Sequence, residues 1–180
     1  MARKHTIHAQ GAGEEDAEAR TVLDVESRLT GDNHQSLKLW LRMLTITNLI
    51  EAEIRSCLRL EFGITLPRFD LMAQLDRYPE GLRMGELSKR MMVTSGNVTG
   101  ITDLLEQEGL VVRDPVPGDR RAFLVKLTPS GRHAFKRMAA RHEAWIRELM
   151  GTVDEHDRAT LFELLSTMKR GLSAREQSEH

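Results

Sequence analysis

The chain has 180 residues with 40% apolar, 29% charged and 4% aromatic side chains, and its formal net charge is −1. This composition fits one globular domain whose core is built from Leu, Ile, Val and Met, and the few Gly and Pro residues argue against an all-β fold. The single cysteine rules out an intrachain disulfide. No stretch resembles a signal peptide or reaches roughly 18 consecutive apolar residues, so we expect a cytoplasmic location and no membrane partner.

Charge is distributed unevenly along the chain. Residues 1–33 carry 4 Lys/Arg against 7 Asp/Glu, a net of −3, and their small, polar composition predicts an acidic, flexible tail with at most a short helix at Val22, Val25 and Leu29. Residues 83–142 carry 11 Lys/Arg against 6 Asp/Glu, a net of +5. A basic middle in a nearly neutral chain indicates a surface for a polyanion.

A long helix is predicted from about Ser36 to Phe62, and Gly63 ends it. Its apolar residues form two adjacent rows, so the helix must bury two surfaces, of which one is the domain core and the other a partner subunit. The first row holds Leu39, Met43, Ile46, Ile50, Ile54 and Cys57, and the second holds Leu37, Leu41 and Leu44.

Three shorter helices follow. The first begins at Thr65-Leu66-Pro67, a capping residue with Pro in the first turn, and ends near Tyr78. The second is a short helix over 84–91, and after a turn over 92–94 the third runs over 95–108 until Gly109, with Val98, Ile101, Leu104 and Leu105 facing inward. A short helix, a turn and a helix form a unit that can set its second helix in a DNA major groove.

The periodicity then changes to that of strands. Residues 110–113 and 123–127 are rich in strand formers, and the segment 114–121 between them is a turn loaded with Pro, Gly and charge. A new helix is predicted to begin at Thr128-Pro129. One face of it carries a coiled-coil-like stripe made of Phe135, Met138, His142, Trp145 and Leu149. Asp154 caps a last helix with inward Leu161, Leu164, Leu165, Met168 and Leu172.

The start of the 95–108 helix has the chemistry of a DNA-reading element. Its outward positions carry small hydroxyls, an amide and two glycines, which allow close approach to base edges and phosphates. The alternative interpretation is an exposed helix start with ordinary cap residues. The candidate DNA contacts here are Thr94, Ser95, Gly96, Asn97, Thr99 and Gly100, with Arg90 on the preceding helix.

The hairpin tip Gly118-Asp119-Arg120-Arg121 is the second signal. Arg120 and Arg121 can pair with phosphates or reach into a narrow minor groove, and Asp119 can hold Arg121 through a salt bridge. A solvated charged turn is the alternative for the tip taken alone. Together with the preceding helix pair, the tip favours DNA binding.

The run from Leu66 to Gly131 resembles the MarR family of winged-helix regulators. It contains MGELSKRMMVTSGNVTGITDLLEQEGLV and then DPVPGDRRAFLVKLTPSGR, in which the family's Asp-x-Arg and Leu-Thr-x-x-Gly wing signature falls at the right spacing. One departure is Arg83, which stands where many members have a capping Ser or Thr. The resemblance covers roughly residues 37–172.

The resemblance implies a mainly α fold with a small β-hairpin wing, that is, a winged helix-turn-helix flanked by long dimerisation helices. It implies a homodimer that binds a pseudo-palindromic double-stranded DNA operator, usually as a repressor that a small molecule releases. The expected parts are a tail (1–33), a first dimerisation helix (34–66), the DNA-binding part (67–128), C-terminal dimerisation helices (129–172) and a frayed end (173–180).

Residues 39–59 followed by LPRFDLMAQLDR further resemble regulators of hydroxycinnamate and related aromatic-acid catabolism. This implies an effector that is an aromatic acid or its CoA thioester, bound between the dimer helices and the DNA-reading part. An apolar pocket with one cation suits such a ligand. The candidate pocket residues are Trp40, Met43, Leu44, Thr47, Arg68 and Met72, although ordinary core packing is the alternative for each.

Three other classes of function are alternatives to a DNA-binding regulator. Cys57 makes a redox-sensing regulator an alternative, but it lies near the end of an apolar helix face, where buried thiols are inert. A winged helix used only for protein contacts should expose an apolar patch in place of the basic tip. No nucleophile elbow, phosphate-binding glycine loop or metal-ligand spacing is present, so we expect no enzyme, no cofactor and no metal.

Overall fold

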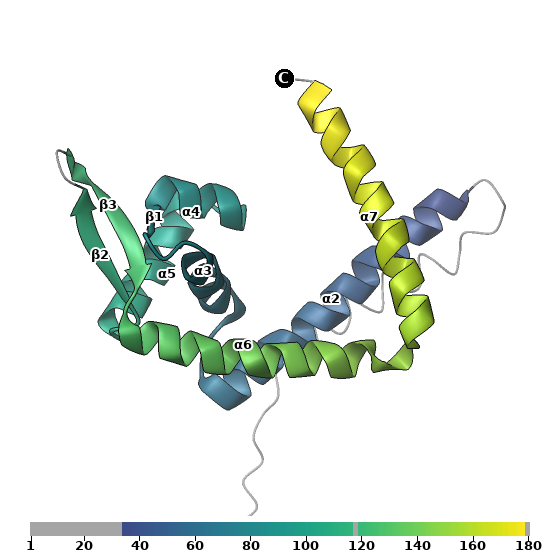
Figure 1. The fold of residues 1–180 in the computed structure, drawn as a ribbon, viewed down its shortest axis with the longest axis horizontal. Coiled ribbons are helices and arrows are strands. Elements are labelled where there is room, and N and C mark those ends of the chain that lie inside the picture. The colour runs from purple at the N-terminus through teal and green to yellow at the C-terminus, as the bar shows by residue number, and fades with distance from the viewer. Residues whose placement is uncertain (1–33, 117–118, 179–180) are drawn as a thin grey trace, which may run out of the picture. The chain divides into compact units, whose positions relative to one another are not determined.

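A computed structural model describes residues 34–116 and 119–178, and the expected acidic tail lies outside them. The chain divides into two compact units after Met138, and each is treated by itself. The elements in chain order (Figure 1) confirm a mainly helical winged helix-turn-helix: α2 (Gln35–Phe62), α3 (Leu66–Arg77), β1 (Leu82–Arg83), α4 (Met84–Met91), α5 (Ser95–Gln107), β2 (Val111–Val116), β3 (Asp119–Leu127), α6 (Pro129–Leu149), a 3-10 turn (Met150–Thr152) and α7 (Glu155–Ser178).

The helix ends follow the capping residues in the sequence. Gly63 ends α2 in the left-handed conformation, with φ 65°. The Thr94 hydroxyl accepts a hydrogen bond from the Asn97 N–H, and the Asp154 carboxylate accepts one from the Asp157 N–H at 2.8 Å. At Arg83, which has no acceptor of its own, the Glu86 carboxylate accepts the Arg83 N–H at 3.0 Å and supplies half of a capping box.

The wing is a three-stranded antiparallel sheet in the order β1-β3-β2. The expected strands over 110–113 and 123–127 were too short, because pairing continues through Asp114↔Leu124 and Pro115↔Phe123. Pro115 is tolerated because β2 is an edge strand, where a missing N–H costs no ladder bond, and a register shift follows it. The two-residue strand β1, with Leu82 opposite Val125, was not expected from the sequence.

The core of the first unit lies where α3 packs on α4, α5 and β3. Its fully buried apolar side chains are Leu58, Leu71, Met72, Leu75, Leu87, Val98, Leu105 and Val125, and Thr102 is fully buried with them. Phe69 of α3 meets Phe135 of α6 with ring centroids 5.5 Å apart. This packing holds α5 against α3 and leaves the opposite side of α5 exposed.

Three details depart from the sequence-based expectations. Leu104 was expected to face inward but is 49% exposed. The apolar residues of α7, expected to be inward, are exposed among the described residues. The last helix continues to Ser178, past the expected frayed start at Ser173, since Ala174, Arg175 and the residues after them are good helix formers.

None of the described helices combines the length and the apolar composition that a membrane span needs.

Gly131 holds the junction between the wing and α6. A Cβ at this position would lie 1.9 Å from the carbonyl oxygen of Leu110, so only glycine fits. The Thr128 hydroxyl donates to the Gly109 carbonyl at 2.7 Å and accepts the Gly131 N–H at 2.9 Å. The Leu-Thr-x-x-Gly part of the wing signature therefore joins the end of α5, the base of the hairpin and the start of α6.

Gly131→Ala should destabilise the protein by about 1–3 kcal/mol, the usual cost of forcing an atom into a packed site. Gly85→Ala is the matched control, because a Cβ there meets no atom of the described chain within 4 Å and should raise stability by up to about 1 kcal/mol. Urea denaturation at one fixed protein concentration measures both. Equal midpoints for Gly131→Ala and the parent would contradict the close approach.

Candidate nucleic-acid interface

The turn between α4 and α5 is fixed by a buried serine and a left-handed methionine. Ser88, only 8% exposed, donates its hydroxyl to the Val93 carbonyl at 2.8 Å. Met92 ends α4 with φ 55°, a conformation that costs a non-glycine residue roughly 1 kcal/mol, and its side chain is 91% exposed. The turn therefore holds α5 at a fixed angle to α4, with α5's N-terminus outward.

The first half of α5 presents a surface with no side-chain bulk at its centre. Gly96 and Gly100 are one turn apart, and a Cβ at either would meet no atom within 4 Å in the described chain. Packing within the protein therefore does not explain these glycines, although each weakens the helix by roughly 1 kcal/mol. Asn97 and Thr99 are exposed beside them, and the Thr99 hydroxyl donates to the Ser95 carbonyl at 3.0 Å.

The second half of α5 is joined to the wing by a double ion pair. Arg113 of β2 is paired with both Asp103 and Glu106, which lie one turn apart on α5. Because the Arg113 side chain is only 21% exposed, this contact is better shielded than an ordinary surface pair. The sequence interpretation missed it, since the signal was only an i, i+3 acidic pair followed by an arginine.

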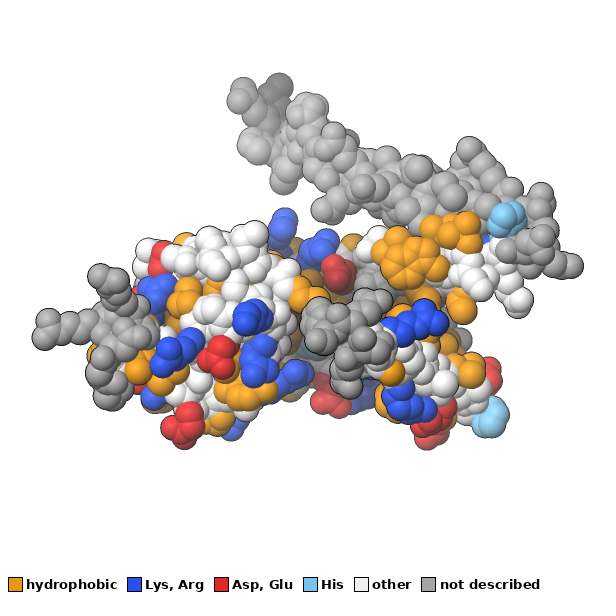
Figure 2. Space-filling model, turned by 90° about the horizontal axis from the view of Figure 1, so that it is seen from above, with side chains coloured by type: hydrophobic (Ala, Val, Ile, Leu, Met, Phe, Trp, Pro, Cys, Tyr) orange, Lys and Arg blue, Asp and Glu red, His pale blue; other side chains and the backbone are white. Residues whose placement is uncertain are grey.

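The candidate basic residues of the interface lie on α4 and at the start of β3. Arg90 donates to the Tyr78 hydroxyl at 2.8 Å and stacks on the same ring at 4.2 Å, so it is held against the end of α3. Asp119, Arg120 and Arg121 begin β3, but their side chains lie outside the described residues, as does the expected Asp119–Arg121 salt bridge. In the face drawn in Figure 2, Lys and Arg side chains are scattered among hydrophobic and white surface, with a few Asp and Glu side chains beside them.

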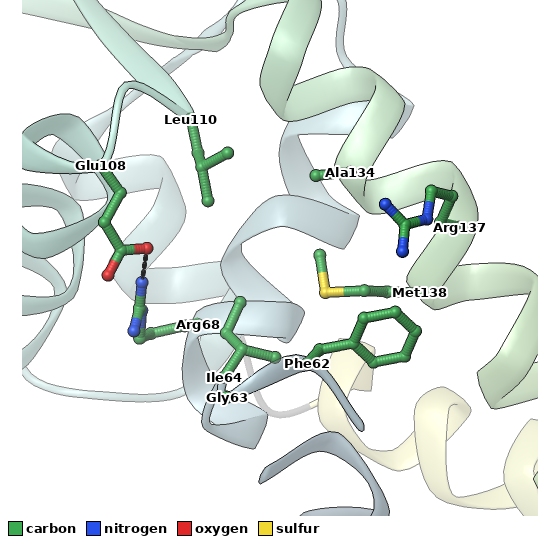
Figure 3. A pocket seen from close by; sticks show the side chains of 9 residues that line it. All are labelled: Phe62, Gly63, Ile64, Arg68, Glu108, Leu110, Ala134, Arg137 and Met138. Atoms are coloured by element: carbon green, nitrogen blue, oxygen red, sulfur yellow. Dashed lines mark hydrogen bonds and ion pairs between the residues drawn. The ribbon is translucent and has the colours of Figure 1, made fainter. Parts of the chain in front are cut away.

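The six candidate ligand residues lie in different surroundings on the single chain. Met72 is fully buried in the core, Trp40 is 54% exposed, and Met43, Leu44 and Thr47 lie on α2 with partial or full exposure. Arg68 lines a cavity of about 120 Å³ together with Phe62, Ile64, Glu108, Leu110, Arg137 and Met138 (Figure 3). Its guanidinium is ion-paired with Glu108, the residue that caps the C-terminus of α5.

Known proteins that resemble this chain in sequence are transcriptional regulators. A profile described as MarR family matches residues 64–123. The chain is 29% identical over 140 residues to the transcriptional activatory protein BadR of Rhodopseudomonas palustris, covering 74% of this chain and 79% of the relative.

Solved structures with the same fold include two regulators. A MarR family transcriptional regulator from Silicibacter pomeroyi is 33% identical, with a TM-score of 0.67 over 79% of this chain and 99% of that chain. Sco3205, a MarR family regulator from Streptomyces coelicolor solved in complex with DNA, is 24% identical, with a TM-score of 0.66 over 81% of this chain and 91% of that chain.

Gly100→Ala separates folding from DNA binding. The substitution should raise stability by about 1 kcal/mol, because the helix gains propensity and the Cβ meets open space. It should lower operator affinity about tenfold or more, since 1.4 kcal/mol of lost contact is a factor of ten. Chemical denaturation and a DNA-binding titration measure the two effects. Gly85→Ala in α4, where a Cβ also meets open space, is the control that should gain stability without losing affinity. Unchanged affinity of Gly100→Ala would contradict a close approach to DNA.

Proposed function

The chain belongs to the MarR family of winged-helix transcriptional regulators, and from that premise we propose that it is a ligand-released repressor that binds a pseudo-palindromic operator as a homodimer. The observation that carries the proposal is the start of α5, where Gly96 and Gly100 form a bare strip between exposed polar side chains. We propose that Asn97 and Thr99 read base edges, and that Thr94, Ser95 and the helix N-terminus contact phosphate.

The wing supplies the second part of the proposed interface. Arg120 and Arg121 follow the turn of the hairpin, where they would reach the DNA backbone or the neighbouring minor groove. The ion pairs of Arg113 with Asp103 and Glu106 would keep the wing and the reading helix in a fixed relation. Arg90, held by Tyr78, would approach phosphate from α4.

The proposed homodimer rests on two apolar helix faces. On α2, Leu37, Leu39, Trp40, Ile46 and Leu49 are 43–55% exposed. On α7, Leu161, Phe162, Leu164, Leu165, Met168 and Leu172 are 43–68% exposed. Apolar residues gathered at this density normally mark a protein interface, and a second copy is the occupant that a two-fold operator requires.

We further propose that the effector is an aromatic acid or its CoA thioester. Trp40, Met43, Leu44 and Thr47 lie on α2 with exposed or half-buried side chains, where a second copy would complete a pocket. Arg68 would supply the cation once its ion pair with Glu108 opens. Because the relative BadR is named an activatory protein, the sign of regulation is part of what the experiment decides.

Arg121→Ala should weaken binding to every DNA sequence by a similar factor. If each arginine contacts one phosphate, the slope of log K against log salt should fall by about one unit for each arginine removed. Fluorescence anisotropy on operator and random DNA at several salt concentrations measures this. An unchanged slope would remove Arg121 from the interface, and a loss confined to the operator would assign it to base reading.

Effector response is tested by a gel shift on the DNA upstream of the protein's own gene. We expect specific binding that p-coumaroyl-CoA, feruloyl-CoA or one of the two free acids releases. Binding indifferent to all four compounds would reject this effector class while leaving the regulator in place. Tighter binding with a compound would reject the ligand-released mechanism.

A further inference from the structure

Met92, in the turn between α4 and α5, combines two features that are unfavourable in a folded chain. Among the described residues it is the one non-glycine residue with a positive φ, and its side chain is 91% exposed. The left-handed conformation crowds its Cβ, and an exposed apolar side chain adds nothing to the hydrophobic core. Of the other large apolar residues described, only Leu60 comes near this exposure, at 84%. The fold itself therefore gives no reason for a methionine at this position.

A glycine would serve the end of α4 better. The backbone N–H of Met92 donates to the carbonyl of Lys89 at 3.3 Å, a helix-ending hydrogen bond that needs no side chain. Helices commonly end on a glycine in this conformation, because glycine lacks the crowded Cβ. The methionine side chain thus costs stability. Residues that break a local rule in this way are concentrated at functional sites.

The turn places Met92 beside the proposed reading surface. Thr94 lies two residues further along the chain, a span of at most about 7 Å. Its hydroxyl accepts the Asn97 N–H and caps α5, so the reading helix begins directly after the turn. Because the described chain leaves the Met92 side chain uncovered, that side chain can reach DNA bound at Thr94 and Ser95.

The surroundings of the turn favour DNA over a protein as the partner of Met92. Residues 87–102 contain no Asp or Glu, and Lys89 and Arg90 are exposed directly before the turn. Over residues 79–103, all of which the structure describes, Met92 is the one large apolar side chain that is exposed. A protein that docks through the hydrophobic effect needs a contiguous patch of such side chains. A single apolar side chain next to cations instead suits a polyanion that carries isolated methyl groups.

We infer that the Met92 side chain contacts the 5-methyl group of a thymine in the operator. Among the DNA bases, thymine alone presents a methyl group in the major groove, and apolar side chains read it there. The thioether side chain is flexible and polarizable, so it fits against a methyl group without a fixed hydrogen-bond geometry. Met92 thereby adds a thymine-specific position to each half-site. The inference rests on the proposed function, because it requires α5 to lie in the major groove.

The test removes the side chain and the thymine methyl group, first separately and then together. Met92→Ala keeps a Cβ in the left-handed conformation, so it shortens the side chain without relaxing the turn. The DNA is the operator that the full-length protein selects from a random pool. Each of its thymines is replaced in turn, in both half-sites, by deoxyuridine, which lacks only the methyl group.

Met92→Ala should weaken binding to the all-thymine operator about fourfold per protomer, the factor that corresponds to one buried methyl-sized group. On the operator with deoxyuridine at the contacted position, Met92→Ala and the parent should bind equally. Fluorescence anisotropy measures both. Leu60→Ala is the matched control, because it truncates another highly exposed apolar side chain, on α2, and should bind each operator like the parent.

Met92→Gly separates the cost to the fold from the gain in binding. Its urea midpoint, at one fixed protein concentration, should rise because glycine relieves the left-handed conformation. Its affinity for the all-thymine operator should fall as in Met92→Ala. A lower midpoint would contradict the stability cost from which a functional side chain is inferred.

A deoxyribose is the other apolar surface that DNA offers near the turn. If Met92→Ala loses the same factor on every deoxyuridine operator and on random DNA, the contact is to deoxyribose, and the choice of thymine is overturned. Binding of Met92→Ala that equals the parent on all of these DNAs overturns the inference as a whole and leaves the regulator intact. Failure of the parent to select any operator would instead overturn the proposed function, and this inference with it.

Discussion

The approach of Gly131 to the Leu110 carbonyl is the constraint on which the DNA-reading geometry depends. A Cβ on residue 131, at the start of α6, would lie 1.9 Å from the carbonyl oxygen of Leu110, which lies between α5 and the wing. Thr128 adds hydrogen bonds to Gly109 and Gly131 there. A side chain at residue 131 would force these three elements apart and change the angle at which the reading helix leaves the protein. The Leu-Thr-x-x-Gly part of the wing signature is therefore required by the fold. It also fixes the base of the hairpin that carries the arginines of the signature.

The two flanks of α5, on either side of Gly96 and Gly100, have different electrostatic surroundings. On one flank, Arg113 pairs with both Asp103 and Glu106 and offsets one of their two negative charges, which would reduce their repulsion of a DNA phosphate. On the other flank, Asn97 and Leu104 line a cavity together with Arg55 and Arg59 of α2. Residues 83–142 have a net charge of +5. The positive character of this part of the chain is thus helped by the ion pairs of acidic residues as well as by exposed basic residues.

Local signals predicted the helices well, because their ends depend on nearby residues such as Gly63, Thr94 and Asp154. The wing was predicted in kind but not in length, since Pro115 reads as a strand breaker unless its edge position is known. Contacts between distant residues were missed: β1 pairs across about 40 residues of sequence, and Arg68 meets Glu108 at a separation of 40. The helical periodicity predicted that Leu104 and the apolar face of α7 would be buried, but both are exposed on the single chain. Periodicity identifies the apolar face of a helix and does not show what covers that face.

The central claim is that two copies of α5 read two halves of one operator. The most direct measurement is selection of bound sequences from a random DNA pool by the full-length protein, followed by hydroxyl-radical footprinting of the selected site. The account predicts an inverted repeat whose half-sites are about 10 base pairs apart, one helical turn, with protection on both halves. An unenriched pool, or protection of a single half-site, would contradict it.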